Sequence, residues 1–324
     1  MRSFVWKSVT FAMAIVVVFG ALEAFIESRP NAAKYKHCWL EKHAGNVGTL
    51  ILGSSHTLYG IDASMLDAGQ NDRAFNLAMV CQTYRYDSYL LAHYDFNRLH
   101  TLIMPYSYFS LYEDFESMPD QRYMAFRYLI YMDCDIHNRL SEYGFEVLNP
   151  SGVKRKIEYL LSGQECIWDS LGTGVNYTLQ ARDSLWDDGV AAAAGNTYPD
   201  TSLVEMNRRF LGDIMSFCHS RNIDLFLITT PVSSTFRCHQ DSRQDSINAA
   251  VLGDMLREHP EVHYMDFSAD GRFTDSDFYD SHHLNTNGRA KLTDIIKRSI
   301  SESCHNDESN KKQTEGKQKN ENRR

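Results

Sequence analysis

The stretch LILGSSHTLYGID, residues 50–62, joins the end of an apolar run to two serines and a histidine. Residues 49–52 have the composition of a short buried strand, which Gly53 ends. A turn at this point needs only small polar residues. Ser54 and Ser55 are therefore either turn residues, or one of them is a nucleophile.

Further apolar runs have the length of buried strands, and helical patterns lie between them. The strand-like runs are AFNLAM (74–79), HTLIMPYS (100–107), IDLFLITTP (223–231) and VHYMDFS (262–268), and helical spacing covers 82–94, 203–221, 242–258 and the residues from 286 onward. This alternation predicts an α/β fold, a flavodoxin-like three-layer sandwich with about five parallel strands. Ligand sites in such sheets lie at the carboxyl ends of the strands, where Gly53 and the residues after Phe267 fall.

Residues 110–200 interrupt the alternation and are rich in aromatic side chains. They predict a mostly helical insertion between strands three and four of a domain that covers 45–300. We expect most of these aromatics to form the core of the insertion rather than a substrate platform. The segment GVAAAAGN, 189–196, reads as a loop. Residues 301–324 have almost no apolar side chain and predict a disordered tail.

The N-terminal segment, residues 1–27, has the pattern of a signal peptide or signal-anchor. Arg2 and Lys7 precede an uncharged stretch over residues 8–22. No good pair of small residues for signal cleavage follows it. We therefore expect an uncleaved anchor with its positive end inside and the rest exported, periplasmic or extracellular. A buried core helix is the alternative interpretation, and the apolar residues that surround the helix argue against it.

Charge and cysteine content exclude several functional classes. The net charge of −9 argues against a nucleic-acid partner, because a phosphate-binding face needs a basic excess. The seven cysteines include no C-x-x-C, which excludes the usual zinc and thioredoxin spacings. An odd number of cysteines leaves at least one thiol unpaired, and the pairing cannot be read from the spacing.

A carboxylate and a histidine near the C-terminus are the groups that a nucleophilic serine requires. The serine needs a base, and the base needs an orienting carboxylate. In DFYDSHHLNTNG, 277–288, Asp280 stands three residues before His283, so the carboxylate can fold back onto one imidazole nitrogen. His282 has the wrong offset and reads as a packing or rim residue. His56 either lines the pocket or is a solvated turn residue.

Two motifs at opposite ends of the domain resemble those of one known family. G-S-S at 53–55 and D-x-x-H-x-N-x-x-G at 280–288 resemble the first and last blocks of the SGNH (GDSL-like) hydrolase superfamily. The closing motif is similar to that of membrane-anchored envelope proteins such as DltD and the alginate O-acetylation proteins. The resemblance covers about residues 47–110 and 203–300, and it does not extend to the insertion.

The resemblance implies a triad of Ser55, His283 and Asp280. It also implies a serine esterase or O-acyltransferase that acts on an acylated envelope carbohydrate, without cofactor or metal, and a membrane-bound acyltransferase as a candidate partner. One alternative is a non-catalytic envelope protein that binds a glycan or a partner with the same cleft. A metal-dependent phosphoesterase, with His56, His282, His283 and Asp280 as the candidate ligands, is another.

The resemblance is weaker for the groups that would donate hydrogen bonds to an oxyanion. The family's second block contains N-x-G, and here Asn76-Leu77-Ala78 has alanine in the glycine position. Because a backbone N–H survives that change, Ala78 can join the N–H of Ser55 as a donor. The asparagine of the third block is missing, and Ser107 or Gln82 is the candidate substitute.

Overall fold

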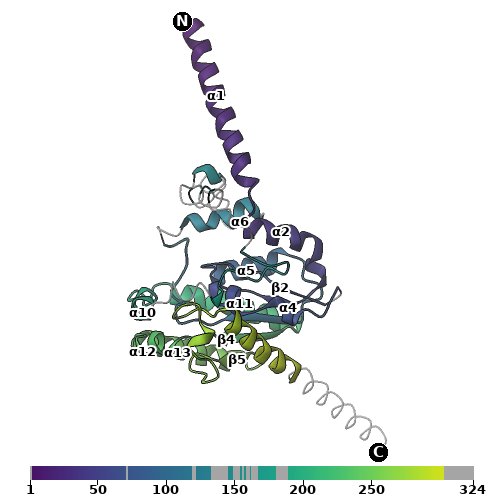
Figure 1. The fold of residues 1–324 in the computed structure, drawn as a ribbon, viewed down its shortest axis with the longest axis vertical. Helices are drawn as coiled ribbons and strands as arrows, with labels where there is room; N and C mark the ends of the chain where they lie inside the picture. Colours follow the sequence, from purple (N-terminus) through teal and green to yellow (C-terminus); the bar gives the residue numbers. More distant parts are fainter. Residues whose placement is uncertain are drawn as a thin grey trace, which may run out of the picture.

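The computed structural model describes residues 2–70, 72–118, 122–132, 145–148, 154, 157, 161, 167–179 and 189–302. Its centre is a five-stranded parallel sheet in the order β2-β1-β3-β4-β5 (Figure 1). The strands are β1 (Val47–Ile51), β2 (Arg73–Asn76), β3 (Thr101–Pro105), β4 (Asp224–Thr229) and β5 (His263–Asp266). The predicted α/β fold with parallel strands is confirmed.

Alternate residues of the central strands enter two separate cores. Leu50, Leu102 and Leu227 belong to one buried cluster. Their neighbours Ile51 and Ile103 belong to the other. Successive side chains of a strand point to opposite faces of the sheet, so a strand covered on both faces must be apolar throughout. This is why these strands read in the sequence as continuous apolar runs.

Helices cover both faces of the sheet and complete the three layers. The first core contains buried residues of α2 (Ala32–His43), α5 (Tyr84–His93), α11 (Val204–Arg221) and α13 (Ser242–Glu258). The second core is closed by α4 (Ala63–Leu66) and the C-terminal helix, residues 286–302. Shorter elements are α3 (Ser55–Gly60), α12 (Ser234–Cys238), η1 (Ala44–Asn46) and η4 (Asp275–Asp277).

The chain between β3 and β4 departs from expectation in two ways. Residues 189–196 are not a loop, because they contain the helix α10 (Val190–Gly195), in which four alanines supply high helix propensity. Tyr112, Phe115 and Tyr128 pack into the first core of the main domain rather than into a core of their own. The described helices of this region also include η2 (Arg122–Ala125), α6 (Phe126–Tyr131) and η3 (Glu146–Leu148). Of the predicted tail, 301–324, the first two residues continue the C-terminal helix, and the rest lie outside the described residues.

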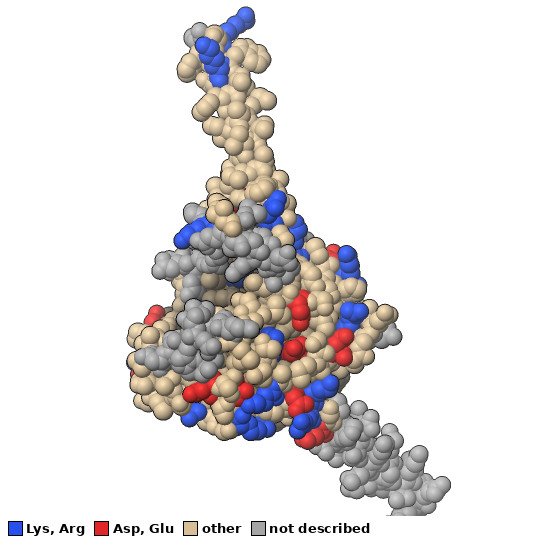
Figure 2. Space-filling model, viewed as in Figure 1, with Lys and Arg blue, Asp and Glu red and all other residues tan. Residues whose placement is uncertain are grey.

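The N-terminal helix α1 (Arg2–Glu27) projects from the body of the protein (Figure 1). It is long and apolar enough to cross a membrane, and most of its side chains are exposed. Figure 2 shows a stem without acidic residues along most of its length and with basic residues at its far end. At its base, the Glu23 carboxylate accepts the backbone N–H groups of Glu146 (2.6 Å) and Val147 (2.7 Å). The helix is thereby joined to η3.

Candidate active site

A glycine turn at the carboxyl end of β1 positions the two serines. Gly53 has φ of +106°, and a Cβ atom there would lie 2.2 Å from Cδ of Pro105 in β3. Only glycine therefore allows the chain to pass so close to the neighbouring strand. The Gly53 N–H donates to Oδ1 of the buried Asp87 at 2.9 Å. The turn is thus held on two sides, and α3 begins directly after it.

The two serines have different surroundings. Ser54 is the N-cap residue of α3, and its Oγ is buried with no hydrogen-bond partner in the described part of the chain. Ser55 is the first residue of α3, and its Oγ lies 2.9 Å from Nε2 of His283. A base within hydrogen-bond distance is the first requirement for an activated hydroxyl. Of the two serines, only Ser55 has it.

The Asp280 carboxylate folds back onto His283, as its spacing predicts. Its Oδ2 and Oδ1 lie 2.9 and 3.0 Å from the His283 Nδ1. Oδ1 also accepts the backbone N–H groups of His283 (2.8 Å) and His282 (3.0 Å). Burial acts to raise the pKa of Asp280, but the hydrogen bond from His283 and the charges of both histidines outweigh it and hold that pKa below its ordinary value. The residue therefore stays ionised beside the imidazole.

Asn285 fixes the loop that carries this pair. Its side-chain nitrogen donates to the backbone carbonyls of Ser276 (2.8 Å) and Phe278 (3.0 Å). Its side-chain oxygen accepts the N–H groups of Asn287 (2.9 Å) and Gly288 (3.1 Å) at the start of the C-terminal helix. Asn285 is therefore the N-cap of the C-terminal helix. It joins the helix start to the loop.

The candidate oxyanion donors other than the Ser55 N–H are engaged by protein groups. The Ala78 N–H donates to Oδ1 of Asn76 at 3.1 Å. Ser107 Oγ lies 2.8 Å from Nδ1 of His56, and the Gln82 amide donates to Asp87 at 2.6 Å. In this resting arrangement a substrate oxyanion would have to share or displace these bonds.

His56 is a buried residue rather than a solvated turn residue. Its Nδ1 is 2.8 Å from Ser107 Oγ and 3.0 Å from Thr230 Oγ1. Burial, together with the charges of His283 and His282, lowers the pKa of His56 well below its ordinary value, so the ring is neutral. Its Nε2 is buried and has no hydrogen-bond partner among the residues that the structure describes.

A stack of three tyrosines lies beside the triad. Tyr177 is sandwiched between Tyr59 and Tyr279, with ring centroids 3.7 and 3.9 Å apart. Its ring centroid is also 5.3 Å from that of His283, in an edge-on arrangement. Tyr177 comes from residues 167–179, which we call the wall segment. No sequence pattern predicts this contact, because Tyr177 lies in the insertion, which the resemblance does not cover.

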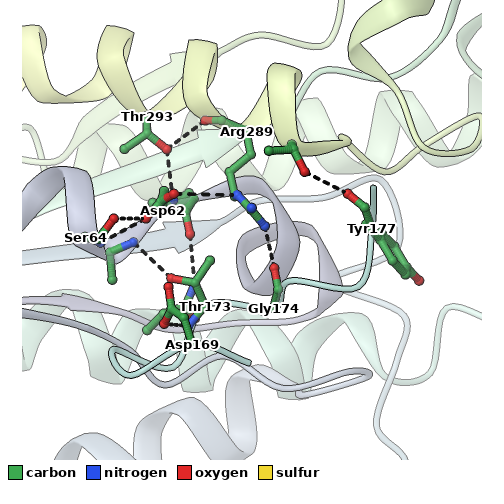
Figure 3. A network of polar contacts seen from close by, with 12 residues as sticks. Asp62, Ser64, Asp169, Thr173, Gly174, Tyr177, Arg289 and Thr293 are labelled. Carbon is green, nitrogen blue, oxygen red and sulfur yellow. Dashed lines mark hydrogen bonds and ion pairs between the residues drawn. The ribbon is translucent and has the colours of Figure 1, made fainter. Parts of the chain in front are cut away.

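The wall segment is fastened by the polar network in Figure 3. Thr173 Oγ1 accepts the N–H of Ala63 at 3.1 Å. The Arg289 guanidinium donates to the carbonyl of Gly174, and its Nε lies 3.9 Å from the Asp62 carboxylate. These contacts join the wall segment to the first residue of α4 and to the C-terminal helix, so part of the insertion is a fixed wall of the site.

A cluster of three histidines also lies at the site. One ring nitrogen from each of His56, His282 and His283 can be chosen so that all three lie within 4.8 Å of one another. The His282 ring stacks on Phe236, with centroids 5.2 Å apart, which agrees with a packing role. Imidazole nitrogens at this spacing are a candidate set of ligands for a transition metal.

The sequence matches no protein-family model and no curated protein. Among solved structures, a GDSL-like lipase from Bacteroides thetaiotaomicron is 10% identical over 84% of this chain and 100% of its own, with a TM-score of 0.42. A protein assigned as an acylhydrolase from Bacteroides fragilis is 9% identical over 85% of this chain and 99% of its own, with a TM-score of 0.43. Similarity at this level carries no inference about chemistry. The function proposed below therefore rests on the side-chain geometry.

Proposed function

We propose that this protein is a serine-dependent ester hydrolase or O-acyltransferase that uses Ser55, His283 and Asp280. One observation supports this above all others. The Ser55 hydroxyl lies 2.9 Å from Nε2 of His283, and Nδ1 of the same ring lies 2.9 Å from the Asp280 carboxylate. These groups meet although 228 residues separate Ser55 from His283. Each group has the partner that its role requires.

In the proposed reaction, Ser55 Oγ attacks the ester carbonyl while Nε2 of His283 takes its proton. Asp280 holds the other ring nitrogen and stabilises the imidazolium that forms. The proton then passes to the leaving alcohol, and an acyl group remains on Ser55. Water completes hydrolysis of this acyl-enzyme, whereas attack by a sugar hydroxyl completes transfer. The Ser55 N–H is the first oxyanion donor, and Ala78 joins it when its bond to Asn76 is shared or broken.

The proposed location is the outer side of a membrane, with α1 as the anchor. Its only Lys and Arg residues, Arg2 and Lys7, lie at the end far from the folded body. Positive charge favours the cytoplasmic side, so the body would be exported. Together with the resemblance to envelope proteins, this favours an acylated envelope carbohydrate as the substrate and a membrane-bound acyltransferase as a partner.

One observation favours a second candidate function, a non-catalytic protein that binds a glycan or a partner in the same cleft. The Ala78 N–H, the Ser107 hydroxyl and the Gln82 amide, which are all the candidate oxyanion donors except the Ser55 N–H, already have protein partners. If they keep these partners when substrate binds, the tetrahedral intermediate has little stabilisation.

Covalent labelling distinguishes the two functions. The full chain in detergent is incubated with a fluorophosphonate probe and with p-nitrophenyl acetate, as wild type, Ser55→Ala and Ser54→Ala. An enzyme is labelled and turns over the ester as wild type, and it loses both activities in Ser55→Ala. Ser54→Ala is the matched control because its hydroxyl has no base beside it, and it should keep its labelling. Absence of labelling in the folded wild type would favour the binding protein.

A further inference from the structure

We propose that His56, His282 and His283 form an inhibitory site for Zn²⁺ or a similar transition-metal ion. The inhibitory effect rests on the proposed serine chemistry, because His283 would be both the base for Ser55 and a ligand of the metal. The binding itself does not depend on that chemistry.

The first argument is the spacing of the ring nitrogens. One nitrogen from each of the three rings lies within 4.8 Å of the other two. Zn–N bonds of about 2.0–2.1 Å place tetrahedral ligands about 3.4 Å apart, so the widest nitrogen–nitrogen separation needs to contract by up to about 1.4 Å. Small side-chain rotations can supply this movement. The His282 and His283 side chains are 16% and 10% exposed, which gives an ion access from solvent.

The second argument is that the other ring nitrogen of each of the three histidines faces a polar group of the protein. Metal-binding histidines usually direct their second nitrogen to a carboxylate, carbonyl or water, which fixes the ring orientation. Here Nδ1 of His283 lies 2.9 Å from Asp280 Oδ2, and Nδ1 of His282 lies 3.4 Å from Asp280 Oδ1. Nδ1 of His56 faces the hydroxyls of Ser107 and Thr230. The ionised Asp280 also provides negative charge for a bound cation.

The third argument is the unexplained nitrogen of His56. Its Nε2 is buried with no hydrogen-bond partner in the described ranges, and a buried polar nitrogen without a partner destabilises the folded state. The proposed triad does not employ it.

A metal at this site would stop the serine chemistry. The Nε2 lone pair of His283 accepts the proton of Ser55 in the proposed reaction. Once that lone pair is donated to a metal, it cannot take the proton, and Ser55 loses its base. A chelator should therefore restore activity, whereas in a metal-dependent hydrolase it would abolish it.

Two measurements on the full chain in detergent test this site. The first is the rate of fluorophosphonate labelling over a ZnCl₂ titration, followed by addition of EDTA. The second is the visible absorption of added Co²⁺, which reports imidazole coordination without any need for activity. Both are made on wild type, on His282→Gln and on His219→Gln. His219 is the matched control because it is an exposed histidine in the last turn of α11, beside Glu261.

We expect Zn²⁺ to suppress labelling of the wild type and EDTA to restore it. His282→Gln should need at least about 10- to 100-fold more Zn²⁺, measured against its own metal-free rate, and should lose the Co²⁺ absorption. His219→Gln should resemble the wild type in both. Equal Zn²⁺ sensitivity and equal Co²⁺ spectra in wild type and His282→Gln would overturn the site. If no form is labelled even without metal, the proposed serine chemistry fails, and the Co²⁺ comparison still decides whether the site exists.

Discussion

The buried carboxyl beneath the serine turn makes the stability of this protein depend on pH. Asp87 is 1% exposed, and its Oδ1 accepts the Gly53 N–H at 2.9 Å and the Gln82 amide at 2.6 Å. Burial raises its pKa from 3.8 to about 7, although both of these hydrogen bonds act to lower it. The folded protein therefore holds a proton on Asp87 at a pH where the unfolded chain has lost it.

The sign and size of the effect follow from that pKa. A carboxyl with a raised pKa in the folded state weakens folding as the pH rises from the unfolded value through the folded one. A rise from 3.8 to about 7 corresponds to about 4 kcal/mol in the free energy of unfolding, lost above pH 7. About 2.5 kcal/mol of this falls between about pH 5 and about pH 8.

The substitution Asp87→Asn isolates the contribution of Asp87 titration to the free energy of unfolding. Its side-chain oxygen can still accept from Gly53 and Gln82, and its amide replaces the protonated carboxyl without titrating. The free energy of unfolding is measured with urea at about pH 5 and at about pH 8. The difference between the variant and the wild type should increase by about 2.5 kcal/mol, in favour of the variant, from the lower pH to the higher. Asp95→Asn, at an exposed aspartate, is the control. A difference between Asp87→Asn and wild type that does not change with pH would refute the reasoning.

Three further substitutions test the site. Asp280→Asn should slow fluorophosphonate labelling by about 10³- to 10⁴-fold, because the orientation and tautomer of the imidazole are lost, and labelling at the wild-type rate would contradict the triad. Gly53→Ala should lower the free energy of unfolding by at least about 1–3 kcal/mol, because its Cβ would lie 2.2 Å from Pro105 at a φ of +106°. Gly271→Ala, where no atom lies within 4 Å of the new Cβ, should change little by the same urea assay. Tyr177→Ala should lower the free energy of unfolding by about 3 kcal/mol or more through loss of two ring pairs, while Tyr177→Phe stays near wild type, and equal losses would argue against stacking.

The strands and most long helices could be predicted because their signals are local. β4 (Asp224–Thr229) lies within the predicted run 223–231, and α13 (Ser242–Glu258) has the predicted bounds. A strand buried on both faces is apolar throughout, and a helix that packs on a core has apolar residues at a helical period. Each element can therefore be recognised from its own residues. The segment 189–196 was predicted wrongly because its glycines and small residues were read as loop, although alanines favour a helix.

The wall segment and the His56 contacts could not be predicted, because they join residues distant in the chain. Tyr177 meets Tyr59 and Tyr279 only after the insertion folds back over α3. Nothing near His56 in the sequence indicates that Ser107 and Thr230 will face its Nδ1. Contacts of this kind depend on how three loops meet at the edge of the sheet.

By itself the sequence determined the parallel α/β class, the apolar N-terminal helix, and the spacing that folds Asp280 back onto His283. These features follow from hydrophobic period and local chain geometry. The resemblance already singled out Ser55, and only the tertiary structure shows a physical difference between the two hydroxyls, because the Ser55 hydroxyl lies beside an imidazole 228 residues away and the buried Ser54 hydroxyl has no hydrogen-bond partner among the described residues. It also decided that three imidazoles share one small volume, because the chain after β5, which carries His282 and His283, meets His56 at the end of β1, although β3 and β4 lie between these two strands in the sheet.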